Sequence, residues 1–408
     1  MADFHLSASM KQGKLYFNLS GRIASQNVTD LSNILTSERK NHPNGSVVFD
    51  CDNLVYISSA GLRVLLSFNK KETEPIKIIN VSPEAYEIFD ITGFTEIFDV
   101  SKKLRDFSNA PDVHMMGVSG GVTVYYVGNE TLLKVYPEGT SLETVETERQ
   151  YSQAALIFEI PTLIAYDIVT YKGQYGMLYE LTKAKTVYSM IGNSMMNQIR
   201  YAEAMGKLLK QIHSINPMID SIPKISDVYK KYASDMSKWF YPKEVETLIK
   251  LINAVPEADT LLYGNFNARN VFVQQDGELI LLNMMNIRYG NPVHDLGQIY
   301  MIYKNTSEKM LKRLSGFGLL QAGKFWDTMM SGYFGTADIN TFKKYEVIFS
   351  AAASLCSALY PAAYKDSNGM DMSINDIEFF VSQARRDIFP SVEKIAEALM
   401  ASKIFLNA

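Results

Sequence analysis

The N-terminal part of the chain alternates between strand-like and helix-like patterns of apolar residues. Residues 15–23 (LYFNLSGRI) alternate apolar and polar positions, which predicts a strand with one buried face. Residues 27–40 then carry apolar side chains at helical spacing. Strands that alternate with short helices predict a compact α/β domain. Further strands are expected at 46–50 and 76–81, and further helices at 60–71 and 83–93, the last with Ser82 as its N-cap.

A β-rich pattern follows. Residues 118–127 and 130–136 are predicted to pair as strands after a glycine-containing turn. Strand-like runs recur at 163–170 and 176–181. This part of the chain is therefore expected to form a second sheet.

Helical patterns dominate the remainder of the chain. Residues 140–158 are predicted to form a helix that begins with a capping box made by Thr140 and Glu143. Beyond Ser194 the pattern is mostly helical, interrupted by a hairpin-like stretch at 271–282. A β-rich part followed by a helical part predicts a second domain with two lobes.

These patterns divide the chain into four segments. An α/β domain is expected over residues 1–107, followed by a linker at 108–113 (SNAPDV). A β-rich lobe is expected at 114–182 and a helical lobe at 183–408. The length of 408 residues agrees with two or three domains.

Composition restricts the classes of protein that these patterns fit. Hydrophobic residues make up 47% of the chain and charged residues 21%, as in a globular protein with enough apolar material for two cores. The formal net charge is −4. Because bulk electrostatic binding to nucleic acid needs a basic face, we do not expect a nucleic-acid partner.

Cysteine usage and hydropathy predict a compartment. Cys51 and Cys356 lie far apart inside apolar runs, which argues against a disulfide framework and favours a reducing compartment. The N-terminus has no apolar signal core, and the most apolar helical stretch, 348–360, is too short to span a bilayer. The five histidines are scattered, so no metal site of Cys and His is expected. We expect a cytoplasmic protein without a membrane span.

Two segments of the first domain carry a family resemblance. The stretch FDCDNLVYISSAGLRVLL (49–66) and the later segment KIINVSPEAYEIFDITGFTEIF (77–98) resemble the STAS family, the anti-sigma-factor antagonists of bacteria. The resemblance covers most of the first 107 residues. It implies a fold of four helices on a mostly parallel or mixed sheet, and a protein partner rather than chemistry.

Ser59 is the residue of interest in this domain. In family members that are phosphorylated, alignment on Gly61-Leu62 places the phosphate-accepting serine at Ser59. The family's acidic residues are missing here, because Ser58 and Ala24 stand in their places. Ser59 is therefore interpreted as a phosphorylation site or as a helix N-cap. We favour a docking surface that works without phosphorylation.

The second domain has a more specific resemblance. The segment LLYGNFNARNVFVQQDGELILLNMMNIRYGNPVHDLG (261–297) resembles the aminoglycoside/choline-kinase-like phosphotransferases. Their pattern is His-Gly-Asp, four residues, Asn, a hairpin, and an Asp that opens the metal loop. The segment LLKQIHSINP (208–217) also looks like that family, and the resemblance spans roughly residues 113–400. It implies a bilobal fold like that of protein kinases.

The catalytic positions of this pattern are changed. Asn265 replaces the aspartate that orients or deprotonates the acceptor hydroxyl, Asn283 replaces the metal-binding aspartate, and Tyr263 replaces the histidine. An amide cannot accept a proton near neutral pH, and loss of a general base costs about 10²–10⁴ in rate. Asn283 also removes an anionic ligand for magnesium. Asn270 keeps its place, and Asp295 is expected to brace the catalytic loop.

Glycines before the first strand pair of this domain suggest a phosphate loop. Gly117, Gly120 and Gly121 are the candidates. Their spacing is not a strict G-x-G-x-x-G, so the pattern alone is weak.

Other nucleotide-binding positions follow from the resemblance. Lys134 (in LLKVY) occupies the place of the phosphate-binding lysine. Glu148 is its expected ion-pair partner, with Glu146 as the alternative. Met177 and Tyr179, in the segment MLYEL, are placed at the hinge that would bind an adenine edge.

Three functions remain open at this point. The first is a regulatory pseudokinase that binds a nucleotide or other ligand weakly and relays this through the STAS-like domain. The second is an active small-molecule phosphotransferase, or another nucleotide-dependent transferase, of unusual mechanism. The third is a structural or assembly module. ATP or another nucleotide is the candidate cofactor, bound in the interlobe cleft with little or no magnesium.

Overall fold

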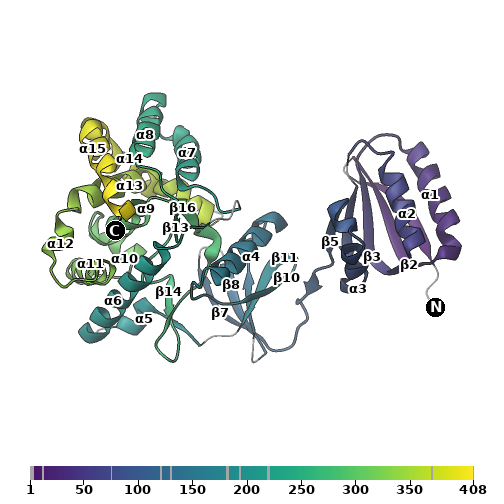
Figure 1. The fold of residues 1–408 in the computed structure, drawn as a ribbon, viewed down its shortest axis with the longest axis horizontal. Helices are drawn as coiled ribbons and strands as arrows, with labels where there is room; N and C mark the ends of the chain where they lie inside the picture. Colours follow the sequence, from purple (N-terminus) through teal and green to yellow (C-terminus); the bar gives the residue numbers. More distant parts are fainter. Residues whose placement is uncertain are drawn as a thin grey trace. The chain divides into compact units, whose positions relative to one another are not determined.

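The chain divides into two units, Met1–Arg105 and Asp106–Ala408, each with its own core. The structure is a computed structural model, and Figure 1 shows its elements in chain order. It describes residues 4–11, 13–74, 76–119, 122–128, 131–180, 183–192, 194–217, 221–368 and 371–407.

The first unit is built on one five-stranded sheet with the order β1-β2-β3-β4-β5. Strands β1 and β2 are antiparallel, and the other neighbouring pairs are parallel. The sheet is therefore mixed, as the sequence suggested. Its elements are β1 (His5–Lys11), β2 (Lys14–Ile23), α1 (Val28–Asn41), β3 (Val47–Ile57), α2 (Ser59–Asn69), β4 (Lys77–Val81), α3 (Pro83–Ile91) and β5 (Asp99–Lys102).

One face of this sheet carries the core of the first unit. Along β2 the buried side chains alternate with partly exposed ones, as the period of a half-buried strand requires. Helices α1, α2 and α3 add buried side chains to the same core. The expectation of four helices is wrong for the described residues 4–11, 13–74 and 76–105, which contain three α-helices and two short 3-10 helices. Strands β1 and β5 were not predicted.

The second unit opens with a six-stranded sheet of order β6-β10-β11-β9-β8-β7. Helix α4 packs against strands of this sheet (Figure 1). The boundary between the units falls just before the expected residue 107, because β6 already belongs to this sheet. The elements of this lobe are β6 (Arg105–Asp106), β7 (Val113–Ser119), β8 (Val122–Val127), β9 (Thr131–Val135), α4 (Leu142–Ile157), β10 (Ala165–Tyr171) and β11 (Gln174–Glu180).

Two local predictions for this lobe are wrong. The stretch 118–127 is not one strand, because it runs from the end of β7 into the antiparallel β8. The capping box of Thr140 and Glu143 is replaced by Ser141, whose hydroxyl accepts a hydrogen bond from the N–H of Thr144 at 3.2 Å. Both errors concern where the chain turns, which side-chain periodicity does not specify.

The helical lobe surrounds a large apolar core to which most of its helices contribute. Helices α6 and α11 approach closely, since a Cβ at Gly206 would lie 2.0 Å from the carbonyl oxygen of Met329. The lobe contains β12 (Lys185–Thr186), α5 (Val187–Ile191), α6 (Met195–Ile212), α7 (Ile225–Asp235), α8 (Pro242–Ala254), β13 (Thr260–Leu262), β14 (Val271–Val273), β15 (Leu279–Leu281), β16 (Arg288–Gly290), α9 (Val293–Tyr303), α10 (Glu308–Leu314), α11 (Leu319–Phe334), α12 (Asn340–Lys343), α13 (Glu346–Asn368), α14 (Ile374–Asp387) and α15 (Val392–Met400).

Helix α13 corrects the expectation about membrane-spanning length. Within it, Glu346–Asp366 is long and apolar enough to cross a membrane by length and composition, with a mean hydropathy of 1.4. In the structure, 67% of that window is buried inside the protein. Burial in the core of the lobe accounts for the apolar composition of this helix.

Candidate functional site

A cavity of about 510 Å³ lies between the sheet of the second unit and the loops of its helical lobe. Its volume falls in the range of small-molecule sites, roughly 300–1,000 Å³. The sheet contributes Val122, Val124, Leu132, Lys134 and Tyr179 to its lining. The helical lobe contributes Tyr188, Asn265, Arg269, Asn270, Leu282 and Asn283, among others.

Strand register explains why the sheet residues meet in this cavity. Lys134 on β9 pairs with Val124 on β8, and Leu132 on β9 pairs with Tyr179 on β11. Directly paired residues and residues two apart on a strand lie on one face of a sheet. These four side chains therefore face the cavity together.

The ammonium of Lys134 forms an ion pair with Glu148 of α4, with 2.5 Å between Nζ and Oε1. Glu148 is buried, and its carboxylate also accepts hydrogen bonds from the hydroxyls of Tyr136 at 2.7 Å and Tyr179 at 3.3 Å. Burial, together with the nearby carboxylate, raises the pKa of both tyrosines well above its ordinary value. Both hydroxyls thus stay protonated and donate. Glu148, rather than Glu146, is the partner of the lysine.

Asp295, at the start of α9, holds the loop that precedes Asn265. Its carboxylate accepts hydrogen bonds from the backbone N–H groups of Tyr263 at 2.8 Å and Gly264 at 2.9 Å. The ring of His213 lies 3.2 Å from the same carboxylate through Nε2 and 2.8 Å from the hydroxyl of Tyr333 through Nδ1. The chain of contacts from the loop through Asp295 and His213 to α11 is buried. It fixes the loop in place.

The amide side chains after Gly264 bond to one another. Asn270 donates from Nδ2 to the carbonyl oxygen of Asn265 at 2.9 Å. Asn267 donates from Nδ2 to Oδ1 of Asn265 at 3.1 Å. The oxygen of the Asn265 amide is therefore already an acceptor within the loop, and it carries no negative charge. It can orient a hydroxyl but cannot remove its proton.

Asn283 follows β15 and also lines the cavity. Its backbone φ is 72°, in the left-handed region that asparagine tolerates better than most residues. The hydroxyl of Tyr263 donates to the carbonyl oxygen of Leu282, the residue before Asn283, at 2.7 Å. This bond ties the two loops together.

The structure thus brings together Lys134, Tyr179, Asn265, Asn270 and Asn283, which the sequence analysis selected, around one cavity. Glu148, Tyr263 and Asp295 support this cavity without lining it, and the remaining selected positions lie outside its lining. Met177 is fully buried inside β11 and is paired on both sides, so its backbone groups are not free for an adenine edge. Gly117 lies in β7 beside a register shift, and Gly120 and Gly121 lie outside the described residues.

Sequence reasoning missed two residues of this region. Arg269, directly before Asn270, lines the cavity with its guanidinium over the ring of Tyr188, 5.0 Å from the centroid. His213 was part of a quoted motif, but its contact with Asp295 was not foreseen. A basic residue inside the catalytic-loop motif was a signal that could have identified Arg269.

The charges around the cavity do not fit a magnesium ion. Among its lining residues in the described part of the chain, Lys134 and Arg269 are the charged ones, and none is a carboxylate. The described residues also contain no cluster of three His, Cys, Asp or Glu side chains that could hold a metal. Magnesium in phosphotransfer sites is held by carboxylates together with phosphates. The cavity instead favours an anion.

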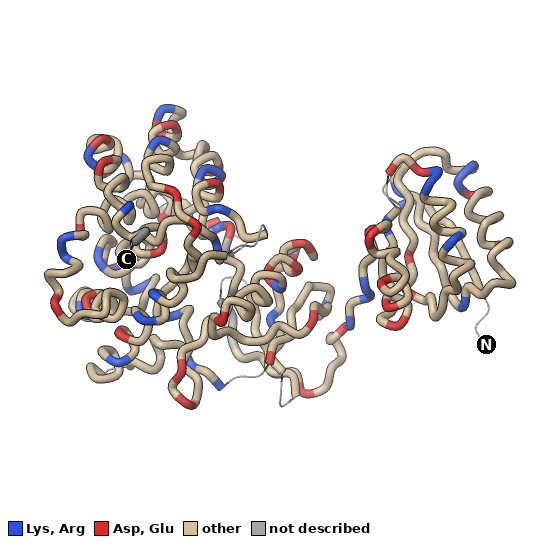
Figure 2. Tube along the Cα trace, viewed as in Figure 1, with Lys and Arg blue, Asp and Glu red and all other residues tan. Residues whose placement is uncertain are grey.

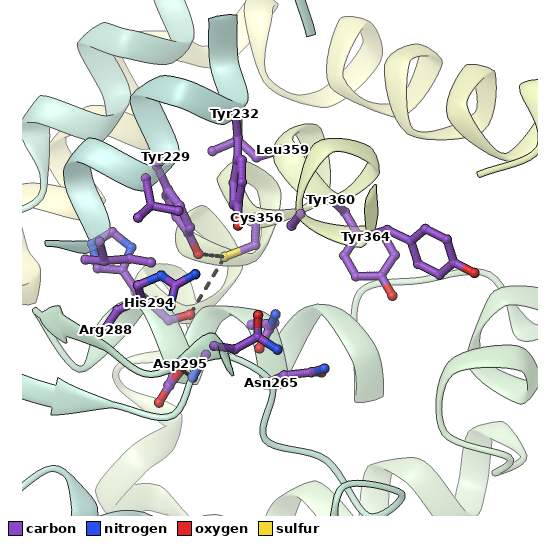
Figure 3. Close-up of a pocket in the computed structure, with 16 residues that line it drawn as sticks. Tyr229, Tyr232, Asn265, Arg288, His294, Asp295, Cys356, Leu359, Tyr360 and Tyr364 are labelled. Atoms are coloured by element: carbon purple, nitrogen blue, oxygen red, sulfur yellow. Dashed lines mark hydrogen bonds between the residues drawn. The ribbon is translucent and has the colours of Figure 1, made fainter. Parts of the chain in front are cut away.

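A second, smaller cavity of about 60 Å³ also has Asn265 in its lining (Figure 3). Tyr229 and Tyr232 lie across it from Asn265 and Asp295. The hydroxyl of Tyr229 is 3.4 Å from the thiol of Cys356. The volume accommodates a few water molecules.

In the first unit, the structure corrects the cap interpretation of Ser59. The N-cap of α2 is Ser58, whose hydroxyl accepts a hydrogen bond from the N–H of Gly61 at 3.2 Å. Ser58 has the extended backbone angles that its capping role requires and is buried, whereas Ser59 is the exposed first residue of the helix. Phosphorylation of Ser59 stays a prediction.

Charge is distributed evenly over the chain. Figure 2 shows basic and acidic residues interspersed along the elements of both units.

Comparison with known proteins identifies both units. The STAS domain family matches residues 5–107, and the family described as phosphotransferase enzyme family matches residues 116–324. A putative anti-sigma factor antagonist, BtrV of Bordetella bronchiseptica, is 35% identical over 92 residues. That match covers 22% of this chain and 78% of the relative.

Several solved structures are similar in fold at low identity. The gentamicin complex of the aminoglycoside phosphotransferase APH(2″)-IIa has a TM-score of 0.47 and 12% identity, and the match covers 78% of this chain and 99% of that one. Choline kinase LicA from Streptococcus pneumoniae has a TM-score of 0.45 and 14% identity. That match covers 74% of this chain and 99% of the kinase. An ethanolamine kinase of Plasmodium vivax has a TM-score of 0.46 and 11% identity. That match covers 69% of this chain and 83% of the kinase. The chain belongs to the phosphotransferase enzyme family and carries a STAS domain before its kinase-like fold.

Proposed function

We propose that this chain is a regulatory protein whose phosphotransferase-family domain is a pseudokinase. The domain binds a nucleotide in the interlobe cavity and does not transfer its phosphate at an ordinary rate. The STAS domain binds a protein partner, and occupancy of the cavity changes that interaction. The site of action is the cytoplasm.

One observation carries the proposal: Asn265 and Asn283 line the same cavity as Lys134. The positions that would hold a general base and a metal ligand therefore face the position that would hold phosphate, and both are neutral. Mutation of one such group already costs several orders of magnitude in rate in enzymes that use it. Binding elements remain, since the ion pair of Lys134 and Glu148 is formed and Asp295 braces the loop.

The small cavity beside Asn265 also supports binding without transfer. With a nucleotide in the main cavity, an acceptor hydroxyl would have to reach Asn265 from the second cavity that this residue lines, which holds about 60 Å³. A transferase acting on a sugar or aminoglycoside needs a larger pocket there. This favours the regulatory hypothesis over an active small-molecule transferase.

The protein partner is proposed from the STAS domain. Ser59 is exposed at the start of α2, next to the cap formed by Ser58. A helix start offers free N–H groups and a positive dipole end to a partner or a phosphate. The relative BtrV is described as a putative anti-sigma factor antagonist, and a protein partner of a comparable regulatory kind is proposed for this chain.

Two measurements test the proposal. The melting temperature of the full chain should rise with ATP in the presence of EDTA, without any need for magnesium. Absence of a shift with every nucleotide tried would eliminate nucleotide binding. Hydrogen exchange of the full chain with and without ATP tests the relay: protection within residues 5–107 should change, and identical exchange there would contradict it.

A further inference from the structure

Arg269 occupies a position that the changed catalytic motif leaves unexplained. Its side chain lines the main cavity together with Asn270 and with Asn283, which replaces the metal-binding aspartate of the family pattern. Among the described residues, the guanidinium contacts the ring of Tyr188 and forms no ion pair. A cation directed into a ligand cavity without a carboxylate partner is available for an anion.

The local structure holds this arginine in place. The backbone N–H of Arg269 donates to Oδ1 of Asn267 at 2.9 Å, and the N–H of Ala268 donates to the hydroxyl of Tyr303 at 3.0 Å. The N–H of Tyr188 donates to the carbonyl oxygen of Ala268 at 2.8 Å, so the backbone of Tyr188 is bonded to the residue directly before Arg269. A backbone held in this way loses less conformational entropy when a ligand binds in the cavity.

The stacking partner is fixed as well. The ring of Tyr188 covers Gly316, where a Cβ would come within 2.2 Å of the ring, and it lies 5.7 Å from the ring of Phe317. The guanidinium therefore lies over an aromatic ring that packs against Gly316 and Phe317. A planar guanidinium in this setting is suited to bidentate contact with phosphate oxygens.

We infer that Arg269 takes over the charge-neutralising role of a metal ion, so that the cavity binds the metal-free polyphosphate of a nucleotide between Arg269 and Lys134. The inference rests on the proposed function, whose ligand class it specifies. Lys134 is already paired with Glu148, so Arg269 provides the uncompensated positive charge among the lining residues described. Magnesium should then weaken binding, because it neutralises the same phosphate oxygens and finds no carboxylate in the lining.

The test compares Arg269→Gln with a matched control in the full chain. Arg200→Gln removes another exposed arginine stacked on a tyrosine, 5.4 Å from the Tyr201 centroid, but outside the cavity lining. Calorimetric titration with ATP in EDTA should show a loss of affinity of about tenfold to a hundredfold for Arg269→Gln only. Arg269→Lys should fall between the wild type and Arg269→Gln. Equal melting temperatures without ligand show that the variants are folded.

The outcomes separate this inference from the proposed function. Equal ATP affinity of Arg269→Gln and wild type would overturn the role of Arg269 and leave nucleotide binding standing. Tighter binding of ATP to the wild type in magnesium than in EDTA would also overturn it. A parallel titration with inorganic tripolyphosphate isolates the anion site. If tripolyphosphate binds through Arg269 while ATP does not, the anion site stands and the nucleotide function fails. If neither binds, both fail.

Discussion

The hydroxyl of Tyr263 donates a hydrogen bond to the carbonyl oxygen of Leu282 at 2.7 Å. The bond connects the loop of Asn265 to the residue that precedes Asn283. Burial raises the pKa of the Tyr263 hydroxyl far above its ordinary value, so that it remains a donor at all working pH values. This bond thus holds the loops of Asn265 and Asn283 together, and both of these side chains are neutral amides that line one cavity.

Restoring one carboxylate should restore a response to magnesium. In Asn283→Asp, the added carboxylate supplies the missing anionic ligand at the cavity wall. We expect magnesium to increase the ATP-dependent rise in melting temperature of this variant, whereas it does not help the wild type. Asn340→Asp, at the start of α12 and outside the cavity lining, adds the same charge as a control. An identical magnesium response of all three proteins would contradict the assignment of Asn283.

The ion pair of Lys134 and Glu148 should show strong coupling. Removal of Lys134 in Lys134→Met leaves the buried carboxylate of Glu148 without its cation, which should cost about 3–5 kcal/mol in free energy of unfolding. The double variant Lys134→Met/Glu148→Gln should regain much of that stability but not ATP binding. The measurement is thermal unfolding followed by calorimetry. Additive effects of the two single changes would show that the pair is not coupled.

Substitution of the two serines at the start of α2 should change the free energy of unfolding by different amounts. Ser58→Ala removes the cap of the Gly61 N–H and should lower the free energy of unfolding of the STAS domain by about 1 kcal/mol. Ser59→Ala changes an exposed side chain and should stay within about 0.5 kcal/mol of the wild type. Calorimetry of both variants checks this. Equal losses would reverse the assignment of the cap.

His294 should make the phosphotransferase-family domain sensitive to acid. Burial lowers the pKa of His294 to about 4, although the nearby Asp295 partly opposes this shift. The unfolded chain binds the proton near its ordinary pKa of about 6.5, so stability is complete above that value and falls as the pH drops toward 4. The loss from this residue should reach about 2 kcal/mol at pH 5 relative to pH 7.5.

The control for this prediction is His294→Gln, which cannot titrate. Its unfolding, measured at pH 5 and at pH 7.5, should depend less on pH than that of the wild type. Parallel pH dependences of wild type and variant would show that the pKa of His294 is not lowered in the folded state.

Much of the fold follows from side-chain periodicity. The alternation in β2 and the helical spacing in α1 and α2 are local patterns that tertiary packing reinforces. The positions of turns are harder to predict from the sequence. The chain reverses direction between β7 and β8, inside a stretch whose side-chain pattern predicts one continuous strand. The exact cap was also missed, since either Ser58 or Ser59 satisfies the sequence preference and only backbone angles distinguish them.

Only the site residues that belong to the family motif could be predicted from the sequence. Spacing located Asn265, Asn270 and Asn283, which the fold places around one cavity. The position of Arg269 inside the motif could have drawn attention to it, but the absence of carboxylates around it is a property of the assembled cavity. The small volume behind Asn265 depends on helices far along the chain and has no local sequence signal.

The most direct test of the central claim is the rate of ATP consumption by the purified full chain in magnesium, with and without a panel of small hydroxyl and amine acceptors. Because Asn265 and Asn283 are neutral, we predict no consumption above the protein-free blank. Turnover at the rates of ordinary kinases, about 1–100 s⁻¹, would contradict the pseudokinase account.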